Sequence, residues 1–275
     1  MHKVLLVEDN QAAREGLSQL LGLSGFSVTT ANDGVEALEK LNEQSFDVML
    51  LDIWLPRMNG LQLLEQLRDK PNLPKVIVMT ADDSPETLLL TLRKQAYQFV
   101  SKPVQPAALV ELLRNTLAAP TGLPAMVVLS ARPGWVEVLV PCARDVADRI
   151  QSYILQLELD LPQAVRETVG LVFRELLLDA MEWDGHLDPN RKVRIAFLRA
   201  RRMLLYRIAD AGSGFRVSDS PAGTAGRQAD ASVETTGHRG GYMGLRPGAI
   251  MARAQADEVL FNEARNEVVV VKYLD

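Results

Sequence analysis

The sequence predicts a two-domain protein in which a doubly wound parallel α/β domain is followed by an α+β domain. Short apolar segments alternate with amphipathic ones throughout the first 118 residues, as in a parallel sheet whose crossovers are helices. A stretch of small residues with two prolines and a glycine then marks a short linker at 119–124. Residues 125–275 mix strand and helix patterns in a different order, which indicates a separate fold.

Length and composition are those of a soluble globular protein. The 275 residues suffice for two cores, and 47% hydrophobic with 24% charged residues is ordinary for such proteins. A net charge of −5 argues against a nucleic-acid-binding surface as the main output. The single cysteine, Cys142, excludes an internal disulfide and fits a reducing compartment. With no signal peptide and no apolar run of about 18 residues, we expect a cytoplasmic protein without membrane contact.

The alternation in the first 118 residues predicts five strands, each followed by a helix. The segment 47–52 is a continuous apolar run between two carboxylates, and such a run suits a central strand buried on both faces of a parallel sheet. The other strands are expected at 4–7, 27–30, 76–80 and 98–100. The helical segments between them carry leucine and alanine at helical spacing, so each can cover the sheet.

Polar side chains stand where four of these strands end. Glu8 and Asp9 follow the first strand, Asp52 ends the third, Thr80 ends the fourth, and Lys102 follows the fifth. Open α/β sheets place their active sites at this edge. Three carboxylates repel one another unless a cation lies among them, and a small set of hard oxygen ligands describes a Mg²⁺ site. With a lysine and a hydroxyl added, the residues form a site for phosphoryl transfer.

In this order, residues 1–118 resemble the receiver domain of two-component response regulators, which has a flavodoxin-like fold. The resemblance implies that Asp52 accepts a phosphoryl group from a cognate histidine kinase. It also implies that Glu8, Asp9 and Asp52 hold Mg²⁺ together with the main-chain carbonyl of Trp54. Any one of these residues alone is more often a cap or a surface group, so the prediction depends on the whole set.

The same resemblance assigns the remaining polar ends. Thr80 is the switch hydroxyl, Lys102 is the phosphate-binding lysine, and Phe99 stands where the family has its switch aromatic residue. The Lys102–Pro103 bond is a candidate cis peptide. Asn59-Gly60 departs from the commoner Asp-Gly, but Asn tolerates a turn equally well, so the expectations stand.

The second half carries two glycine-rich loops on either side of residues 216–239, which are poor in large apolar groups. Asp210 opens the first loop, and the second, at 240–245, precedes a helix. Glycines let the backbone approach a phosphate or a base closely, and a helix N-terminus binds anions. Upstream, Glu175 and Asp179 lie one turn apart on a helix expected from 162 to about 183. Such a pair, taken alone, is more often a solvated surface pair.

The order of acidic helix, Asp-x-Gly-x-Gly, loose segment and Gly-x-x-Gly-Leu resembles the ATP-binding α+β sandwich shared by gyrase, the Hsp90 chaperones, histidine kinases and MutL. Within this superfamily, residues 135–275 look most like the anti-sigma-factor serine kinases. The resemblance implies a Mg-ATP site in which Asp210 bonds the adenine amino group, Gly212 and Gly214 line the base pocket, Gly241 and Gly244 face the phosphates, and Glu175 is the catalytic base or orients a water.

Asp179 departs from this family, which has Asn there as a Mg²⁺ ligand. A carboxylate is also a hard oxygen ligand, so metal binding remains compatible with Asp. Its negative charge near a triphosphate should, however, lower ATP affinity when no metal is present. Trp183 also stands where His or Tyr is commoner.

Together these patterns predict a response regulator with a non-DNA output. Phosphorylation of Asp52 would shift Thr80 and Phe99 and so change how the second domain docks or dimerises. That domain would act as an anti-sigma-type serine/threonine kinase on an anti-sigma antagonist, or would sequester a partner such as a sigma factor. Two alternatives remain: a domain without catalysis that only holds a protein partner, and a histidine-kinase-like ATPase that acts on another protein.

Overall fold

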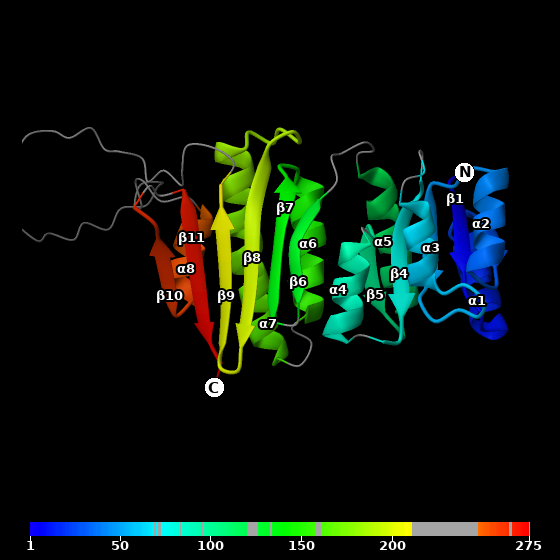
Figure 1. Ribbon diagram of the computed structural model, residues 1–275, viewed down its shortest axis with the longest axis horizontal. Coiled ribbons are helices and arrows are strands. Elements are labelled where there is room, and N and C mark those ends of the chain that lie inside the picture. Colours follow the sequence, from blue (N-terminus) through cyan, green and yellow to red (C-terminus); the bar gives the residue numbers. More distant parts are fainter. Residues whose placement is uncertain are drawn as a thin grey trace, which may run out of the picture.

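The computed structural model describes residues 1–68, 70, 73–82, 84–94, 96–119, 126–132, 134–157, 161–210, 247–263 and 266–274. These ranges contain two sheets, one parallel and one antiparallel, which follow each other along the long axis of the molecule (Figure 1). Within them, no helix combines the length and the apolar character needed to cross a membrane.

The first sheet has five parallel strands in the order β2-β1-β3-β4-β5, so the predicted doubly wound α/β architecture is confirmed. The strands are β1 (Lys3–Val7), β2 (Ser27–Ala31), β3 (Val48–Asp52), β4 (Lys75–Thr80) and β5 (Gln98–Ser101). The helices are α1 (Gln11–Leu23), α2 (Gly34–Glu43), α3 (Gly60–Leu67), α4 (Pro85–Arg93) and α5 (Pro106–Ala118). The strand order reverses between β1 and β3, which is where open α/β sheets bind their ligands.

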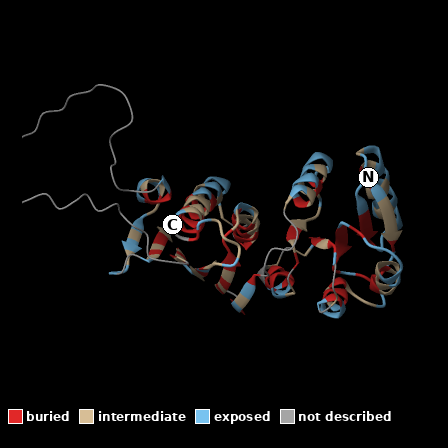
Figure 2. Cartoon of the chain, turned by 90° about the horizontal axis from the view of Figure 1, so that it is seen from above, coloured by how far each residue is buried: buried red, intermediate tan, exposed pale blue. Residues whose placement is uncertain are grey.

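Strand β3 lies at the centre of this sheet, and all of its residues are buried. Leu50 belongs to one apolar cluster, whereas Met49 and Leu51 belong to the other, because successive side chains of a strand point to opposite faces. Figure 2 shows the buried residues gathered between the sheets and their helices. Burial of both faces explains the uninterrupted apolar run, which carries Asp52 to the carboxyl edge of the sheet.

The second sheet has six antiparallel strands in the order β10-β11-β9-β8-β7-β6. They are β6 (Val127–Arg132), β7 (Trp135–Pro141), β8 (Lys192–Ala200), β9 (Met203–Ala209), β10 (Glu258–Phe261) and β11 (Glu267–Tyr273). Helices α6 (Arg144–Leu157), α7 (Gln163–Asp179) and α8 (Pro247–Gln255) cover one face of it, which makes a two-layer α+β arrangement (Figures 1 and 2). The boundaries at residues 118 and 125 remain a prediction, and 120–124 of the predicted linker lie outside the described residues.

The long helix expected from 162 to about 183 is α-helical only to Asp179. The chain then widens into one turn of π-helix, η1 (Ala180–Asp184), closed by a hydrogen bond of 3.0 Å from the Gly185 amide to the Ala180 carbonyl. A β-carbon on Gly185 would lie 2.4 Å from the sulfur of Cys142. The wider turn therefore brings the chain against Cys142 at a point where only glycine fits, a tertiary contact that helical periodicity does not predict.

The two domains contact each other through α4 and β5 on one side and α6 and β6 on the other (Figure 1). The guanidinium of Arg149 lies 3.9 Å from the ring centroid of Tyr97, and its Nε donates to the Tyr97 carbonyl at 2.9 Å. The Tyr153 hydroxyl donates to the Ala96 carbonyl at 3.1 Å. Burial raises the pKa of Tyr97 to about 12, although the charge of Arg149 acts in the opposite direction. The tyrosine is therefore a neutral ring under a cation.

The interface also includes an apolar cavity and a polar contact near the sheet edge. Leu92 of α4 and apolar residues of α6, β7 and β8 enclose about 20 Å³, enough for about one water molecule. The hydroxyl of Ser101 donates to the side-chain oxygen of Gln156 at 3.2 Å. Since Ser101 directly precedes Lys102, the second domain contacts β5 one residue from the predicted phosphate-binding lysine.

Replacing Arg149 by Ala should loosen the contact between the two domains. The change removes a cation–π contact and a hydrogen bond, which together contribute about 2 kcal/mol in a partly buried setting. We expect calorimetry to show a larger difference between the unfolding temperatures of the two domains than in the wild type. Arg144→Ala is the matched control, because Arg144 lies on the same helix but pairs with Glu182. Identical melting profiles of the two variants would contradict this interface.

Candidate functional site

Three carboxylates converge at the carboxyl edge of the parallel sheet. Glu8 and Asp9 follow β1, and Asp52 ends the adjacent strand β3. Each residue offers one carboxylate oxygen, and the three oxygens lie within 4.8 Å of one another. Glu8 and Asp52 are buried, whereas Asp9 is exposed to solvent. The structure therefore brings together the acidic residues that the sequence placed at separate strand ends.

Lys102 lies between two of these acids. Its ammonium donates hydrogen bonds to Glu8 Oε2 and to Asp52 Oδ2. Burial by itself lowers the pKa of Lys102, but the hydrogen bonds and negative charges of Asp52 and Glu8 outweigh burial and raise it above its ordinary value. The lysine therefore stays charged and offsets the repulsion between the two carboxylates.

Thr80 and Phe99 lie on the two strands beyond Asp52. Thr80 is fully buried at the end of β4 and pairs with Ser101 of β5, and its carbonyl accepts the Lys102 amide at 2.8 Å. Its hydroxyl oxygen accepts the amide of Asp82 at 3.2 Å. Phe99 is buried, and the Lys102–Pro103 peptide is cis, as the sequence predicted.

The loop after Asp52 folds back onto the residue that it follows. The Trp54 amide donates to Asp52 Oδ1 at 3.1 Å, and the Gly60 amide donates to the Ile53 carbonyl at 2.9 Å. A β-carbon on Gly60 would lie 2.3 Å from the Asp52 carbonyl oxygen, so α3 can begin this close to the site only with glycine. Asn59 caps α3 in a capping box with Gln62. The Asn-Gly pair thus serves helix entry and close packing.

Sequence reasoning missed Arg14, which supports the acidic pair. Its guanidinium donates to the carbonyl of Glu8 at 2.7 Å and to that of Asp9 at 3.0 Å. These contacts fix the loop that carries both side chains. Residue types alone do not predict that an arginine bonds main-chain carbonyls. The one available signal was the position of Arg14 in the first turn of α1, close in sequence to Glu8 and Asp9.

The donor set fits a magnesium ion. The three groups offer only oxygen atoms, the class of ligand that Mg²⁺ prefers, and the exposed Asp9 leaves a side open for the waters that this ion retains. When bound, the ion would neutralise charge on the carboxylates and on a phosphoryl group beside them.

Comparison with known proteins agrees with this geometry. The family model of the response regulator receiver domain matches residues 4–114. The chain is 40% identical over 117 residues to the transcriptional regulatory protein CpxR homolog of Haemophilus influenzae, covering 42% of this chain and 51% of that one, about half its length. It is 30% identical over 200 residues to the DNA-binding response regulator MtrA of Mycobacterium tuberculosis, covering 72% of this chain and 86% of MtrA.

The chain belongs to the response regulator family. Among solved structures, a CheY-like receiver domain protein from Methanospirillum hungatei is 32% identical, with a TM-score of 0.41, and the match covers 42% of this chain and 94% of that one. Receiver domains bind Mg²⁺ at an acidic site and are phosphorylated by cognate histidine kinases. The cluster of Glu8, Asp9 and Asp52 is the corresponding acidic site in this response regulator.

The acidic helix of the second domain differs from a solvated surface pair. Asp179 of α7 is buried, and its Oδ2 accepts the Gly248 amide in the first turn of α8 at 2.8 Å. A β-carbon on Gly248 would lie 2.7 Å from that oxygen and from the Glu175 carbonyl oxygen, so the start of α8 packs directly on α7. A carboxylate at a helix N-terminus is electrostatically favourable. The surface interpretation of Asp179 is therefore wrong, because α8 covers it.

The remaining candidates of this domain are Glu175 on α7, Asp210 after β9, and four glycines. Glu175 is partly buried, and its carboxylate accepts Nη1 of Arg174 at 3.0 Å. Asp210 directly follows β9, and its amide donates to the Asn266 carbonyl at 2.9 Å. Four predicted binding residues are outside the described residues: Gly212, Gly214, Gly241 and Gly244.

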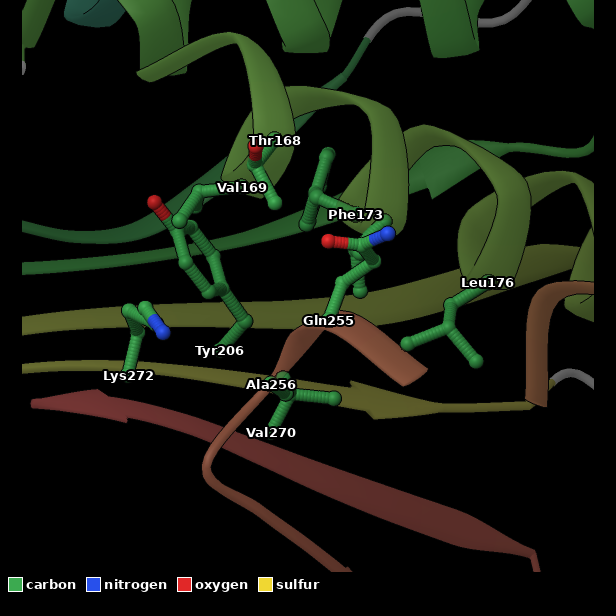
Figure 3. Close-up of a pocket in the computed structure, with 10 residues that line it drawn as sticks. Thr168, Val169, Phe173, Leu176, Tyr206, Gln255, Ala256, Val270 and Lys272 are labelled. Atoms are coloured by element: carbon green, nitrogen blue, oxygen red, sulfur yellow. The ribbon is translucent and has the colours of Figure 1, made fainter. Parts of the chain in front are cut away.

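A small cavity lies between α7, the end of α8 and strands β9 and β11 (Figure 3). Apolar side chains such as Val169, Phe173 and Val270 line it, and Thr168 and Lys272 lie at its edge. Its volume of about 10 Å³ holds about one water molecule, whereas ligand pockets measure roughly 300–1,000 Å³. The cavity is therefore a gap in core packing and is too small for a nucleotide.

The raised pKa of Lys102 predicts a loss of stability at alkaline pH. A group whose pKa is raised by folding stabilises the fold fully below its unfolded-state pKa, about 10.4 for lysine, and loses this effect as the pH rises through the folded-state pKa. The difference in unfolding free energy between wild type and Lys102→Met should stay constant from about pH 7 to 9 and shrink above about pH 10.5 in urea titrations.

Lys102→Arg is the control for this titration. Arginine keeps its charge beyond pH 12, so the stability of this variant relative to Lys102→Met should persist where that of wild type declines. A wild-type difference that shrinks between about pH 7 and 9 would contradict a raised pKa.

Proposed function

We propose that this response regulator is phosphorylated on Asp52 by a histidine kinase and controls an ATP-binding output domain that acts as an anti-sigma-type serine/threonine kinase. The observation that carries the first part is the cluster of Glu8, Asp9 and Asp52 within 4.8 Å, with Lys102 bonded to two of its members. This set combines a nucleophile, oxygen ligands for a cation and a fixed positive charge.

The chain's own residues can perform the transfer in one step. An oxygen of Asp52 forms a bond to phosphorus while the bond from phosphorus to the kinase's histidine nitrogen breaks. Glu8 and Asp9 would hold a cation together with the Trp54 carbonyl, and that cation would supply charge neutralisation for the phosphoryl oxygens. Lys102 is within reach of Asp52 and supplies a second positive charge, and transfer of this kind depends mainly on such positioning and charge neutralisation.

The docked second domain supports an intramolecular output. Thr80 pairs with Ser101, and the Ser101 hydroxyl donates to the Gln156 side chain. Tyr97, which directly precedes the same strand, lies against Arg149. A phosphoryl group that draws the Thr80 hydroxyl toward it would disturb a strand held at both ends by α6. The phosphorylated and unphosphorylated conformations would then differ in the contacts between α6 and β5. Such a difference is what allows phosphorylation to shift the population from one conformation to the other.

The architecture of the second domain supports an ATP-binding role. Helix α7 carries Glu175 and Asp179 at its C-terminal end, and Asp210 stands at the end of β9. Helix α8, which follows the second glycine-rich loop, begins against the same two acids of α7. The contact of α8 with Glu175 and Asp179 is compatible with the superfamily resemblance, in which the acidic helix lies near the segment that follows the second glycine-rich loop.

One observation favours a second candidate, an output domain that has lost catalysis and only holds a protein partner. The Asp179 carboxylate, at the position expected to bind a metal, accepts the Gly248 amide and so serves as an anchor for α8. A structural role accounts for Asp in place of Asn, because the charge strengthens this contact with a helix N-terminus.

A nucleic-acid-binding output is a third candidate, because MtrA is a DNA-binding response regulator and the similarity to it extends over 200 residues. The net charge of −5 counts against this candidate. Binding to duplex DNA that weakens steeply with salt would favour it.

Acetyl phosphate labelled with ³²P should label the wild-type protein in the presence of Mg²⁺ and should not label Asp52→Asn. The product is an acyl phosphate, so hydroxylamine should release the label. Asp47→Asn is the matched control, because Asp47 lies at the other end of the β3 region, where it accepts the Lys3 amide. Equal labelling of wild type and Asp52→Asn would show that Asp52 is not the acceptor.

Calorimetry should detect ATP binding to the wild type with Mg²⁺ and tighter metal-free binding to Asp179→Asn. Removing one negative charge near a triphosphate should improve metal-free affinity by about tenfold. Glu263→Gln removes an exposed charge as the control. Absence of ATP binding in every variant would contradict an ATP-binding output. Binding without transfer of the γ-phosphoryl group to a serine of an anti-sigma antagonist would favour the partner-holding domain.

A further inference from the structure

The loop between β3 and α3 is tied to the start of α2 by a carboxylate with four hydrogen bonds. Asp33 is almost fully buried, and its Oδ1 accepts the amides of Val35 at 2.8 Å and Glu36 at 3.0 Å, which caps α2. Its Oδ2 accepts Nε of Arg57 at 2.6 Å and also Nη2 of the same guanidinium. One oxygen thus serves the helix, and the other holds the loop.

The main chain reinforces this connection at a second point. The Gly34 amide, next to Asp33, donates to the carbonyl of Met58, next to Arg57, at 3.1 Å. A β-carbon on Gly34 would lie 2.6 Å from that carbonyl oxygen. Two adjacent residues of α2's entry therefore hold two adjacent residues of the loop, which begins at Asp52 and contains Trp54.

Arg57 holds this position in a backbone conformation that disfavours it. Its φ of 58° is in the left-handed region, where glycine is the residue at ease. Its side chain is 59% exposed, so burial of apolar surface does not explain an arginine here. The contact with the buried Asp33 does explain it, because a glycine at this position would fit the backbone but leave Oδ2 without the guanidinium.

We infer that Arg57 is a positioning residue for the phosphorylation site, which holds the loop carrying the Trp54 carbonyl against α2 through Asp33. It touches neither Asp52 nor the other acids of the cluster and acts only through the loop. The inference adds a positioning pair to the proposed phosphoacceptor site and rests on that proposal, and it predicts an effect on Mg²⁺ affinity larger than the effect on the transfer step.

The test compares Mg²⁺ binding by calorimetry in the full-length wild type, Arg57→Gly, Arg57→Ala and Asp33→Asn. Residues that orient metal ligands typically change metal affinity at least about tenfold when removed, so each variant should bind Mg²⁺ about tenfold more weakly. With acetyl phosphate, the Mg²⁺ concentration for half-maximal labelling should rise by a similar factor, while the rate at saturating Mg²⁺ stays within about twofold of wild type.

Arg57→Gly is the decisive variant, because glycine adopts the left-handed backbone without strain while the change removes the side chain that bonds Asp33. Wild-type Mg²⁺ affinity in this variant would overturn the inference. Asp33→Asn keeps an oxygen to cap α2, and the double variant Arg57→Ala/Asp33→Asn should bind Mg²⁺ no more weakly than either single variant. Additive losses would mean that the two residues act separately and would also overturn it.

Arg68→Ala is the matched control, since Arg68 is an exposed arginine at the far end of α3 whose charge removal should leave Mg²⁺ binding unchanged. Urea unfolding without Mg²⁺ gives a readout independent of the metal, in which the Arg57 and Asp33 changes should again be non-additive. Failure of acetyl phosphate to label the wild type would overturn the proposed function, whereas equal Mg²⁺ affinity of wild type and Arg57→Gly would overturn this inference.

Discussion

Three carboxylates within 4.8 Å of one another, two of them buried, would drive the ends of β1 and β3 apart unless positive charge lay among them. Lys102 supplies that charge from the end of β5, so an electrostatic requirement at this edge links β5 to β1 and β3, two strands with which β5 does not pair. The apolar body of the sheet fixes where the strands end, and the ammonium allows the ends to carry acids. A ligand that changes the charge at this edge would therefore alter the balance that holds these strand ends together.

Main-chain packing fixes the loops around this edge. Gly60 lets α3 begin directly on the Asp52 carbonyl, and Gly34 lets the entry of α2 contact the Met58 carbonyl. Both glycines stand where a β-carbon would collide with backbone, which cannot move aside as a flexible side chain can. The loop after Asp52 is therefore held by two close main-chain contacts, at Gly60 and at Gly34, that are possible only without a side chain. The ion pair between Asp33 and Arg57 adds a third contact.

The sequence predicts the parallel sheet well because its information is local. The apolar run of β3 indicates burial of both faces, and each polar strand end indicates the sheet edge, so the sequence alone predicts that Asp52 and Lys102 lie close together. Asp179 could not be placed in this way, because its burial results from α8, almost 70 residues further along the chain. The role of Arg57 could not be predicted from the sequence, because its partner Asp33 has the pattern of an ordinary helix N-cap.

The interface between the domains was predictable only in outline. A docked second domain follows from the resemblance to receiver domains, but the contact of Arg149 with Tyr97 depends on the relative placement of two folds. The same limit applies to the glycine-rich loops of the second half, whose predicted roles are carried by residue order and not by a local packing pattern. Periodicity describes how an element packs on its own sheet, and it does not describe what lies beyond that sheet.

The placement of α6 against α4 and β5 has a consequence for any other protein that would use this face. Two sites on one chain meet at an effective concentration that is about millimolar for a short connection. A competitor present at about micromolar concentration must therefore overcome an advantage of roughly a thousandfold before it displaces α6. The covalent connection between the two domains therefore excludes weak competitors from the surface of α4 and β5. A protein can bind this surface only when its affinity is high or when α6 is bound less tightly.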